Sequence, residues 1–138
     1  MTPSAADYSA VVQSPPDTVD DAHDFLQRVW AERSDLTAAE RVVFETVLSE
    51  LVTNVIQNNP QRPVLCRVNL RVGPEELVLE TTDTGAELEV VPDRSMPADD
   101  AEHGRGLALI ELMVDRLDYT RRDGQNIWTA TKSRVAAA

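Results

Sequence analysis

The sequence predicts a two-layer α/β (α+β) sandwich, in which three main helices cover one face of a mixed, mainly antiparallel sheet. Three segments repeat apolar residues at helical spacing, and each needs a surface to cover. Short alternating segments meet at turn residues such as Asp123-Gly124, a strong cue for a hairpin. With 138 residues, the chain is long enough for one domain with its own core.

The N-terminal part is expected to form a strand and then a helix. Residues 8–13 are typical of a short strand, and Pro15 ends it. Asp17 or Thr18 then provides the N-cap of a helix. Two acidic residues occupy the first turn of that helix, where they interact favourably with the positive end of the helix dipole.

A second helix is predicted to begin after Thr37. Glu40 follows three residues later, so the two residues form a capping-box signature. The apolar periodicity continues to about Asn58, and Pro60 stops the helix there.

The remaining chain is expected to form hairpins around one more helix. Residues 64–72 alternate polar side chains, including Arg67 and Asn69, with apolar ones, so one face of the sheet is predicted to be polar. The expected elements are strands over 64–72, 76–83, 119–122 and 127–134, a helix over about 104–118, and a strand-like stretch over 88–91 within a loop.

The domain is predicted to span residues 8–134, with a frayed N-terminus at 1–7 and a tail at 135–138. No apolar run approaches the roughly 20 residues that a membrane span requires. The N-terminus lacks the basic-then-apolar pattern of a signal peptide. We therefore expect a soluble cytoplasmic protein that does not bind membranes.

The charge and the rare residue types exclude several classes of function. The net charge of −11 would repel nucleic acid. Residues 1–50 carry ten acidic against three basic side chains, which favours a basic or neutral partner at that half. A single cysteine, Cys66, allows no intramolecular disulfide, and with only two histidines it makes no zinc site of normal ligand count.

Polar residues on the second helix form the first candidate site. Glu50, Asn54 and Asn58 are spaced four residues apart and form one ridge beside the apolar face. A carboxylate followed by amides can hold a divalent cation and polarise a hydroxyl group or water. Taken alone, the ridge is better explained as a partly exposed helix border.

Two further motifs follow along the chain. Asp83, Thr84 and Gly85 stand at the end of a predicted strand, where a carboxylate can accept a hydrogen bond from the exocyclic amine of a purine. Gly104-Arg105-Gly106-Leu107 opens the last predicted helix, whose free N–H groups suit phosphate oxygens. The ordinary alternatives are an Asp turn that caps its own backbone and a flexible loop before a helix.

The three motifs together resemble the GHKL ATPase superfamily. The segment E-L-V-T-N-V-I-Q-N at 50–58 looks like its N-box, D-T-G-A at 83–86 like its G1 box, and G-R-G-L at 104–107 like its G2 box. The resemblance covers about residues 10–133. The small size and the sequence S-E-L-V-T-N resemble the anti-sigma-factor serine kinase branch most closely.

This resemblance implies a GHKL-type ATP-binding fold and a role for each motif. Glu50 would be the general base, and Asn54 would bind the Mg²⁺ that bridges the phosphates. Asp83 would bind the adenine amino group, and Gly85 would let the chain pass beside the base. The nucleotide-binding set would also include Asn58, Gly104, Arg105, Gly106 and Leu107, and residues 87–103 would form a lid over ATP.

The implied function is that of an ATP-binding anti-sigma factor and protein-serine kinase. Its partners would be a sigma factor and an anti-anti-sigma factor with a STAS domain, which carries the phosphorylated serine. Dimers are common in this family, so a homodimer is compatible with the resemblance.

Two departures from the family pattern favour an alternative. Glu87 stands where the G1 box usually has a second glycine, and the last strand opens with Gln125-Asn126-Ile127 in place of a Gly-Thr step. The alternative is a regulatory binding module of the same fold, catalytically weak or inactive, that acts through protein contacts. A detached ATPase domain of a sensor histidine kinase is less well supported, because no dimerising helix with a histidine precedes it.

Overall fold

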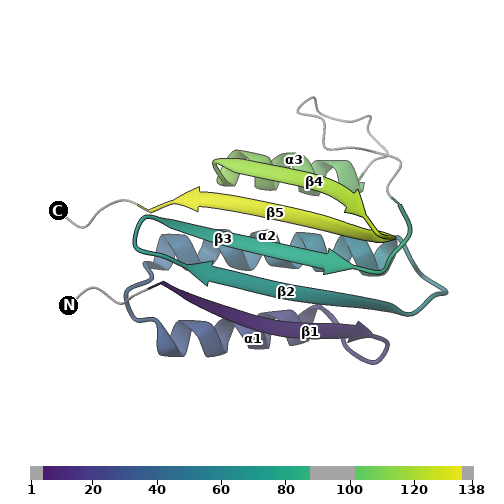
Figure 1. Cartoon of the computed structure of the whole chain (residues 1–138), viewed down its shortest axis with the longest axis horizontal. Helices are drawn as coiled ribbons and strands as arrows, with labels where there is room; N and C mark the ends of the chain where they lie inside the picture. Colours follow the sequence, from purple (N-terminus) through teal and green to yellow (C-terminus); the bar gives the residue numbers. More distant parts are fainter. Residues whose placement is uncertain (1–4, 88–101, 135–138) are drawn as a thin grey trace.

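The computed structural model describes residues 5–87 and 102–134, with side chains described from residue 106 onward in the second range. In these residues, three helices lie on one face of a five-stranded sheet (Figure 1). The strand order is β1-β2-β3-β5-β4, and each neighbouring pair is antiparallel. The predicted two-layer sandwich is therefore confirmed, although the described sheet is antiparallel throughout and contains no parallel pair.

The N-terminal strand and helix follow the prediction closely. The strand β1 (Ala6–Ser14) is longer than expected because it pairs with the whole of the neighbouring strand, from Ala6 opposite Val72 to Ser14 opposite Val64. Thr18 is the N-cap of α1 (Val19–Glu32), and its hydroxyl accepts a hydrogen bond from the Asp20 N–H. The other candidate for the cap, Asp17, accepts instead from the Gln13 N–H and closes the turn between strand and helix.

The capping box predicted for the second helix is present. The Thr37 N–H donates to the Glu40 carboxylate at 2.9 Å, and the Glu40 N–H donates to the Thr37 hydroxyl at 3.1 Å. This helix, α2 (Ala38–Gln57), lies at the centre of the helical layer and contacts both α1 and α3. The helix ends at Gln57 with Asn58 as its C-cap.

The central hairpin has the predicted bounds. The strands are β2 (Val64–Val72) and β3 (Glu76–Asp83), and β2 alternates buried apolar residues with more exposed ones such as Arg67 and Asn69. Their register places Cys66 opposite Asp83. The last residue of β3 therefore turns its carboxylate toward the helical layer, while Thr82 faces the other way.

The C-terminal elements differ from the prediction at one junction. The helix α3 (Glu102–Met113) ends earlier than the predicted limit near residue 118, and β4 (Arg116–Arg122) begins earlier than predicted. Leu117 has the right spacing for the apolar stripe of α3, but it pairs opposite Ala130 in the sheet and is buried there. The long partner strand β5 (Gln125–Ser133), joined to β4 by a two-residue turn, extends the pairing to Arg116 and outweighs the local helical pattern.

The turn between β4 and β5 is the predicted Asp123-Gly124. Both residues have positive φ, 54° and 76°, as a type I′ hairpin turn requires. The strand-like stretch predicted over 88–91 and most of the predicted lid lie outside the described residues.

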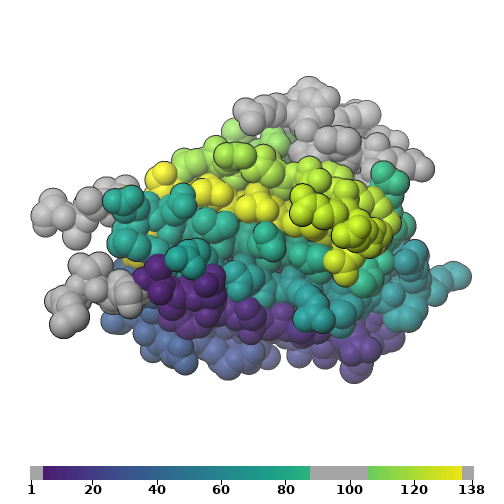
Figure 2. All heavy atoms as spheres, in the orientation of Figure 1, coloured from purple at the N-terminus to yellow at the C-terminus, as the bar shows by residue number. Residues whose placement is uncertain are grey.

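The core lies between the sheet and the helices and is almost entirely aliphatic, with Phe44, Phe25 and Trp128 among its few aromatic side chains. None of the helices in residues 5–87 and 102–134 covers the opposite face of the sheet, and Figure 2 shows its strands side by side at the surface from β1 to β4. This open face is polar, as predicted from the alternation in β2. No helix in the described part of the chain is long and apolar enough to cross a membrane.

A cluster of charged side chains joins the C-terminal end of the sheet to the linker before α2. Arg134 donates to Asp35 and Glu40 at 3.0 and 3.1 Å and to the Gly73 carbonyl at 2.9 Å. Arg33, only 5% exposed, forms a two-pronged pair with Asp35 at 2.9 and 3.0 Å. The two guanidinium groups hold the pKa of Asp35 well below its usual range.

Candidate functional site

Glu50 and Gly106 bring the first and third motifs together. Glu50 lies midway along α2 and is half-buried, and Gly106 lies in the second turn of α3. A Cβ atom built on Gly106 would lie 2.6 Å from the carboxylate carbon Cδ of Glu50. A larger residue at position 106 would therefore require the Glu50 carboxylate, the end of a flexible side chain, to move away.

Asn54 follows Glu50 by one turn on the same helix and is also half-buried. The two side chains provide carboxylate and amide oxygens, which are the hard ligands that Mg²⁺ prefers. Magnesium commonly takes one or two protein ligands and completes its shell with phosphate oxygens and water. This donor set fits Mg²⁺ that is bound together with a polyphosphate. Among the described residues, no group of three or more His, Cys, Asp or Glu side chains is placed to hold a metal ion.

Asp83 is the buried acid of the second motif. Its residue is 3% exposed, and its Oδ1 accepts hydrogen bonds from the Gly85 N–H at 2.8 Å and from Asn126 Nδ2 at 3.0 Å. Burial raises the pKa of Asp83, while those two hydrogen bonds and the nearby charge of Arg121 oppose the rise. The same burial, with the negative charge of Asp83 nearby, raises the pKa of the Cys66 thiol to about 12, so Cys66 is an inert core residue.

Gly85 is required by a close approach of the backbone. A Cβ atom at this position would lie 2.6 Å from Asn59 Nδ2 and 2.8 Å from Asp83 Oδ1. Val55 of α2 lies 3.3 Å from the same point. The loop after β3 therefore packs directly against the end of α2, which links the second motif to the first.

Asn58, the last residue of the predicted ridge, is the exposed C-cap of α2, and its place in the nucleotide-binding set stays a prediction. Its neighbour Asn59 is 8% exposed and joins α2 to the loop after β3: its Nδ2 donates to the Val55 carbonyl at 2.7 Å, and its Oδ1 accepts from the Ala86 N–H at 3.0 Å. Sequence reasoning missed Asn59 because its contact with Ala86 depends on how the loop after β3 packs against α2.

Asn126 is the second residue that sequence reasoning missed. It is 2% exposed and its Nδ2 contacts Asp83, the Gly85 carbonyl and the Ala86 carbonyl. A signal was present in the sequence, because Asn126 alternates with the buried residues Trp128 and Ala130 and is a polar residue on an apolar strand face.

The third motif lies in the first two turns of α3, close to the predicted place, although the helix begins two residues earlier, at Glu102. The N–H groups of Glu102, His103 and Gly104 belong to its first turn and lack partners within the helix. Gly106 follows them against Glu50, and Leu107 is buried in the core, so Leu107 offers a ligand only its backbone. The side chain of Arg105 lies outside the described residues.

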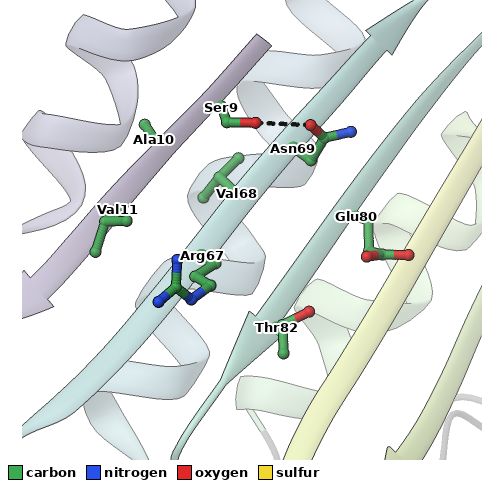
Figure 3. Close-up of a pocket in the computed structure, with 8 residues that line it drawn as sticks. All are labelled: Ser9, Ala10, Val11, Arg67, Val68, Asn69, Glu80 and Thr82. Carbon is green, nitrogen blue, oxygen red and sulfur yellow. Dashed lines mark hydrogen bonds between the residues drawn. The ribbon is translucent and has the colours of Figure 1, made fainter. Parts of the chain in front are cut away.

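One of two cavities is lined by a residue of this site, Asn59, and the other lies on the open face of the sheet. One, of about 370 Å³, lies between the end of β1 and the loop after α2 and is lined in part by Ile56, Asn59 and Arg62. Arg62 donates to the Thr84 carbonyl at 3.0 Å and so holds the loop after β3. The other, of about 340 Å³, lies on the open face of the sheet, where Figure 3 shows Ser9 bonded to Asn69. It is separated from Asp83 by the sheet itself.

Comparison with known proteins agrees with this arrangement. Residues 12–132 match the family of histidine kinase-like ATPase domains. Over 121 residues the chain is 31% identical to the serine/threonine-protein kinase BtrW of Bordetella bronchiseptica, an alignment that covers 83% of this chain and 84% of that protein.

The chain belongs to the histidine kinase-like ATPase family, the GHKL superfamily, as its three motifs indicated. Its similarity to BtrW supports the placement in the branch that contains anti-sigma-factor kinases. Membership in this family supports ATP binding, and the structure places Gly106 against Glu50 of α2 and Gly85 against Val55 of the same helix.

Proposed function

We propose that this protein is an ATP-dependent protein-serine kinase of the anti-sigma-factor type. The observation that carries the proposal is the packing of the Glu50 carboxylate against Gly106, because it puts a base one turn beyond the start of α3, where the first turn presents free N–H groups. The similarity to a serine/threonine-protein kinase supports the same activity.

Each residue of the site has a separate role in the proposed phosphoryl transfer. Glu50 accepts the proton of the substrate serine as its Oγ forms a bond to the γ-phosphorus, while the bond from that phosphorus to the leaving ADP oxygen breaks. The N–H groups of the first turn of α3, including that of Gly104, would bind phosphate oxygens, and Asn54 would hold Mg²⁺. Bound Mg²⁺ neutralises the charge of the phosphates. Asp83 binds the base.

The partners in this proposal are an anti-anti-sigma factor with a STAS domain, which receives the phosphoryl group, and a sigma factor that the kinase holds inactive. The acidic excess over residues 1–50 suits a basic partner surface. Exposed charges are screened beyond about 8–10 Å at physiological salt, so partner binding is expected to weaken at high salt. An affinity that does not change with salt would exclude this docking surface.

Phosphate transfer tests the proposal directly. The chain, Mg²⁺ and γ-labelled ATP are incubated with a STAS-domain partner, and label on serine is measured. Glu50→Gln is expected to lower the rate by about 10²–10⁴, the usual contribution of a general base, while ATP binding remains. Glu80→Gln, which changes a glutamate on the open sheet face, is the matched control. Absence of label with a verified partner would overturn the kinase proposal.

Glu87 favours the second candidate, a regulatory binding module without catalysis. It is an exposed acid immediately after the bonded loop 84–86, where it would repel phosphates. Calorimetric titration with Mg-ATP separates the candidates, because micromolar or tighter binding contradicts a module that uses protein contacts alone.

A further inference from the structure

We propose that Asn126 is a positioning residue for the nucleobase, which fixes the Asp83 carboxylate to accept from a 6-amino group and so selects adenine over 6-oxopurines. The inference rests on the proposed nucleotide binding and goes beyond it, because it names a residue and a base selectivity that the motifs do not contain.

The amide of Asn126 has its orientation fixed from both sides. Its Nδ2 donates to Asp83 Oδ1 at 3.0 Å and to the Ala86 carbonyl at 2.9 Å. Its Oδ1 accepts from the Tyr119 hydroxyl at 2.5 Å and from Arg121 Nη1 at 2.9 Å. An amide turned over would face donors with its NH₂ and acceptors with its oxygen, so only one orientation satisfies these four groups.

The fixed amide determines which oxygen of Asp83 is available. Both hydrogen bonds that Asp83 receives from described residues, from the Gly85 N–H and from Asn126, end on Oδ1. A rotation of the carboxylate about its χ2 bond would break both of them. The second oxygen, Oδ2, therefore keeps one direction and is the acceptor left for a ligand.

Arg121 and Tyr119 hold this arrangement in place. Arg121 Nη1 also donates to the Gly85 carbonyl at 3.2 Å, so one guanidinium group binds both Asn126 and the loop. The Tyr119 ring packs on Trp128 with centroids 4.8 Å apart, and its hydroxyl is thereby directed at Asn126. These contacts come from β4 and from β5, and β5 is the strand in which the sequence departs from the family pattern.

The selectivity follows from the matching of donors and acceptors. An ionised Oδ2 accepts a hydrogen bond from the 6-amino group of adenine. Hypoxanthine and guanine present a carbonyl oxygen at that position, and two acceptors facing each other leave both unsatisfied in a buried site. Without Asn126 the carboxylate can rotate or take up a proton, and a protonated Oδ2 would donate to a 6-oxo group. Loss of Asn126 should therefore weaken ATP binding and relax the selectivity together.

Calorimetric titration of the full chain with Mg-ATP and with Mg-ITP tests the proposal. The unaltered chain is expected to bind ATP more tightly than ITP, and Asn126→Ala is expected to lower the ratio of the two affinities about tenfold or more. Asn69→Ala, which removes a bonded amide from the open face of the sheet, should leave the ratio unchanged. Asn126→Thr, which keeps one donor, should give an intermediate ratio and is the second variant if Asn126→Ala unfolds.

The outcomes separate the two proposals. If a variant of Asn126 lowers the ATP and ITP affinities by the same factor, or changes neither, the ratio of the two affinities is unchanged. This result would overturn the positioning role. Absence of ATP binding to the unaltered chain would overturn the proposed function itself, together with the inference that rests on it.

Discussion

The carboxylate of Glu50 occupies the space where a side chain on Gly106 would begin. Because a Cβ atom at Gly106 would lie 2.6 Å from Glu50 Cδ, the carboxylate can keep this position only if residue 106 has no side chain. The contact joins α2 to α3 at the point where the proposed phosphoryl transfer takes place.

Gly106→Ala is expected to abolish activity without loss of stability. Alanine favours a helix over glycine by about 1 kcal/mol, and the flexible Glu50 side chain can rotate away from the new methyl group. The free energy of unfolding should stay within about 1 kcal/mol of the original, while phosphoryl transfer falls about 10²-fold or more because the base is displaced. In a Glu50→Ala background the same change should cause no further loss. An additive loss would contradict the displacement.

Asp83→Asn is expected to weaken nucleotide binding and to raise stability near neutral pH. Burial raises the pKa of Asp83 above its ordinary value of 3.8. Its stabilising contribution is therefore complete below pH 3.8 and is lost as the pH rises through the folded-state pKa. The neutral asparagine does not incur the burial cost of a charge and can still accept at its Oδ1.

The same shift predicts a pH dependence for binding. In the unaltered chain, the affinity for Mg-ATP measured by titration should fall on acidification at a pH above 3.8. The Asp83→Asn variant should not show this fall. If the affinity of the variant falls in the same pH range, another group is responsible.

Asn59→Ala is expected to destabilise the protein, and its neighbour provides a matched control. Removing the Asn59 amide leaves the Val55 carbonyl and the Ala86 N–H without a partner, which costs about 1–3 kcal/mol. Asn58→Ala changes an exposed cap residue and should cost less than about 0.5 kcal/mol. Urea unfolding measures both values, and equal costs would contradict the assignment of Asn59.

Asp35→Asn is expected to lower the free energy of unfolding by about 3 kcal/mol at pH 7, because it leaves Arg33 and Arg134 without their shared partner. The pKa of Asp35 is lowered in the folded state, so its contribution is present above pH 3.8 and is lost as the pH falls toward the folded-state value. Asp118→Asn breaks an exposed pair with Arg116 and should cost under about 1 kcal/mol. Similar losses in the two variants would refute this difference.

Local signals predicted much of the fold. The alternation of β2 and the Gly73-Pro74 turn defined the central hairpin, and the Thr37–Glu40 pair defined the start of α2, because each is encoded within a few residues. The end of α3 could not be predicted in this way. Leu117 suits a helix and a strand equally well, and only its pairing with Ala130 decides between them.

The site residues that belong to short sequence motifs could be predicted, whereas a residue that strand pairing brings into the site could not. Glu50, Asp83 and Gly106 belong to short motifs, and the structure packs Gly106 against Glu50 and the loop after Asp83 against the end of α2. Asn126 lies in the last strand, far along the chain from Asp83, and its function depends on the antiparallel register that places the two residues opposite each other. No local spacing encodes that register.

The length of α2 has a consequence for short nucleotides. From Glu50 to Gln57 the helix rises about 10 Å, so α2 separates the proposed proton acceptor, Glu50, from the loop after β3 that carries the proposed base-binding site. A nucleoside monophosphate can occupy the Asp83 end without its phosphate reaching Glu50, which makes occupancy and turnover separable events. A single residue inserted between Asn54 and Gln57 would turn the far end by about 100° and uncouple them.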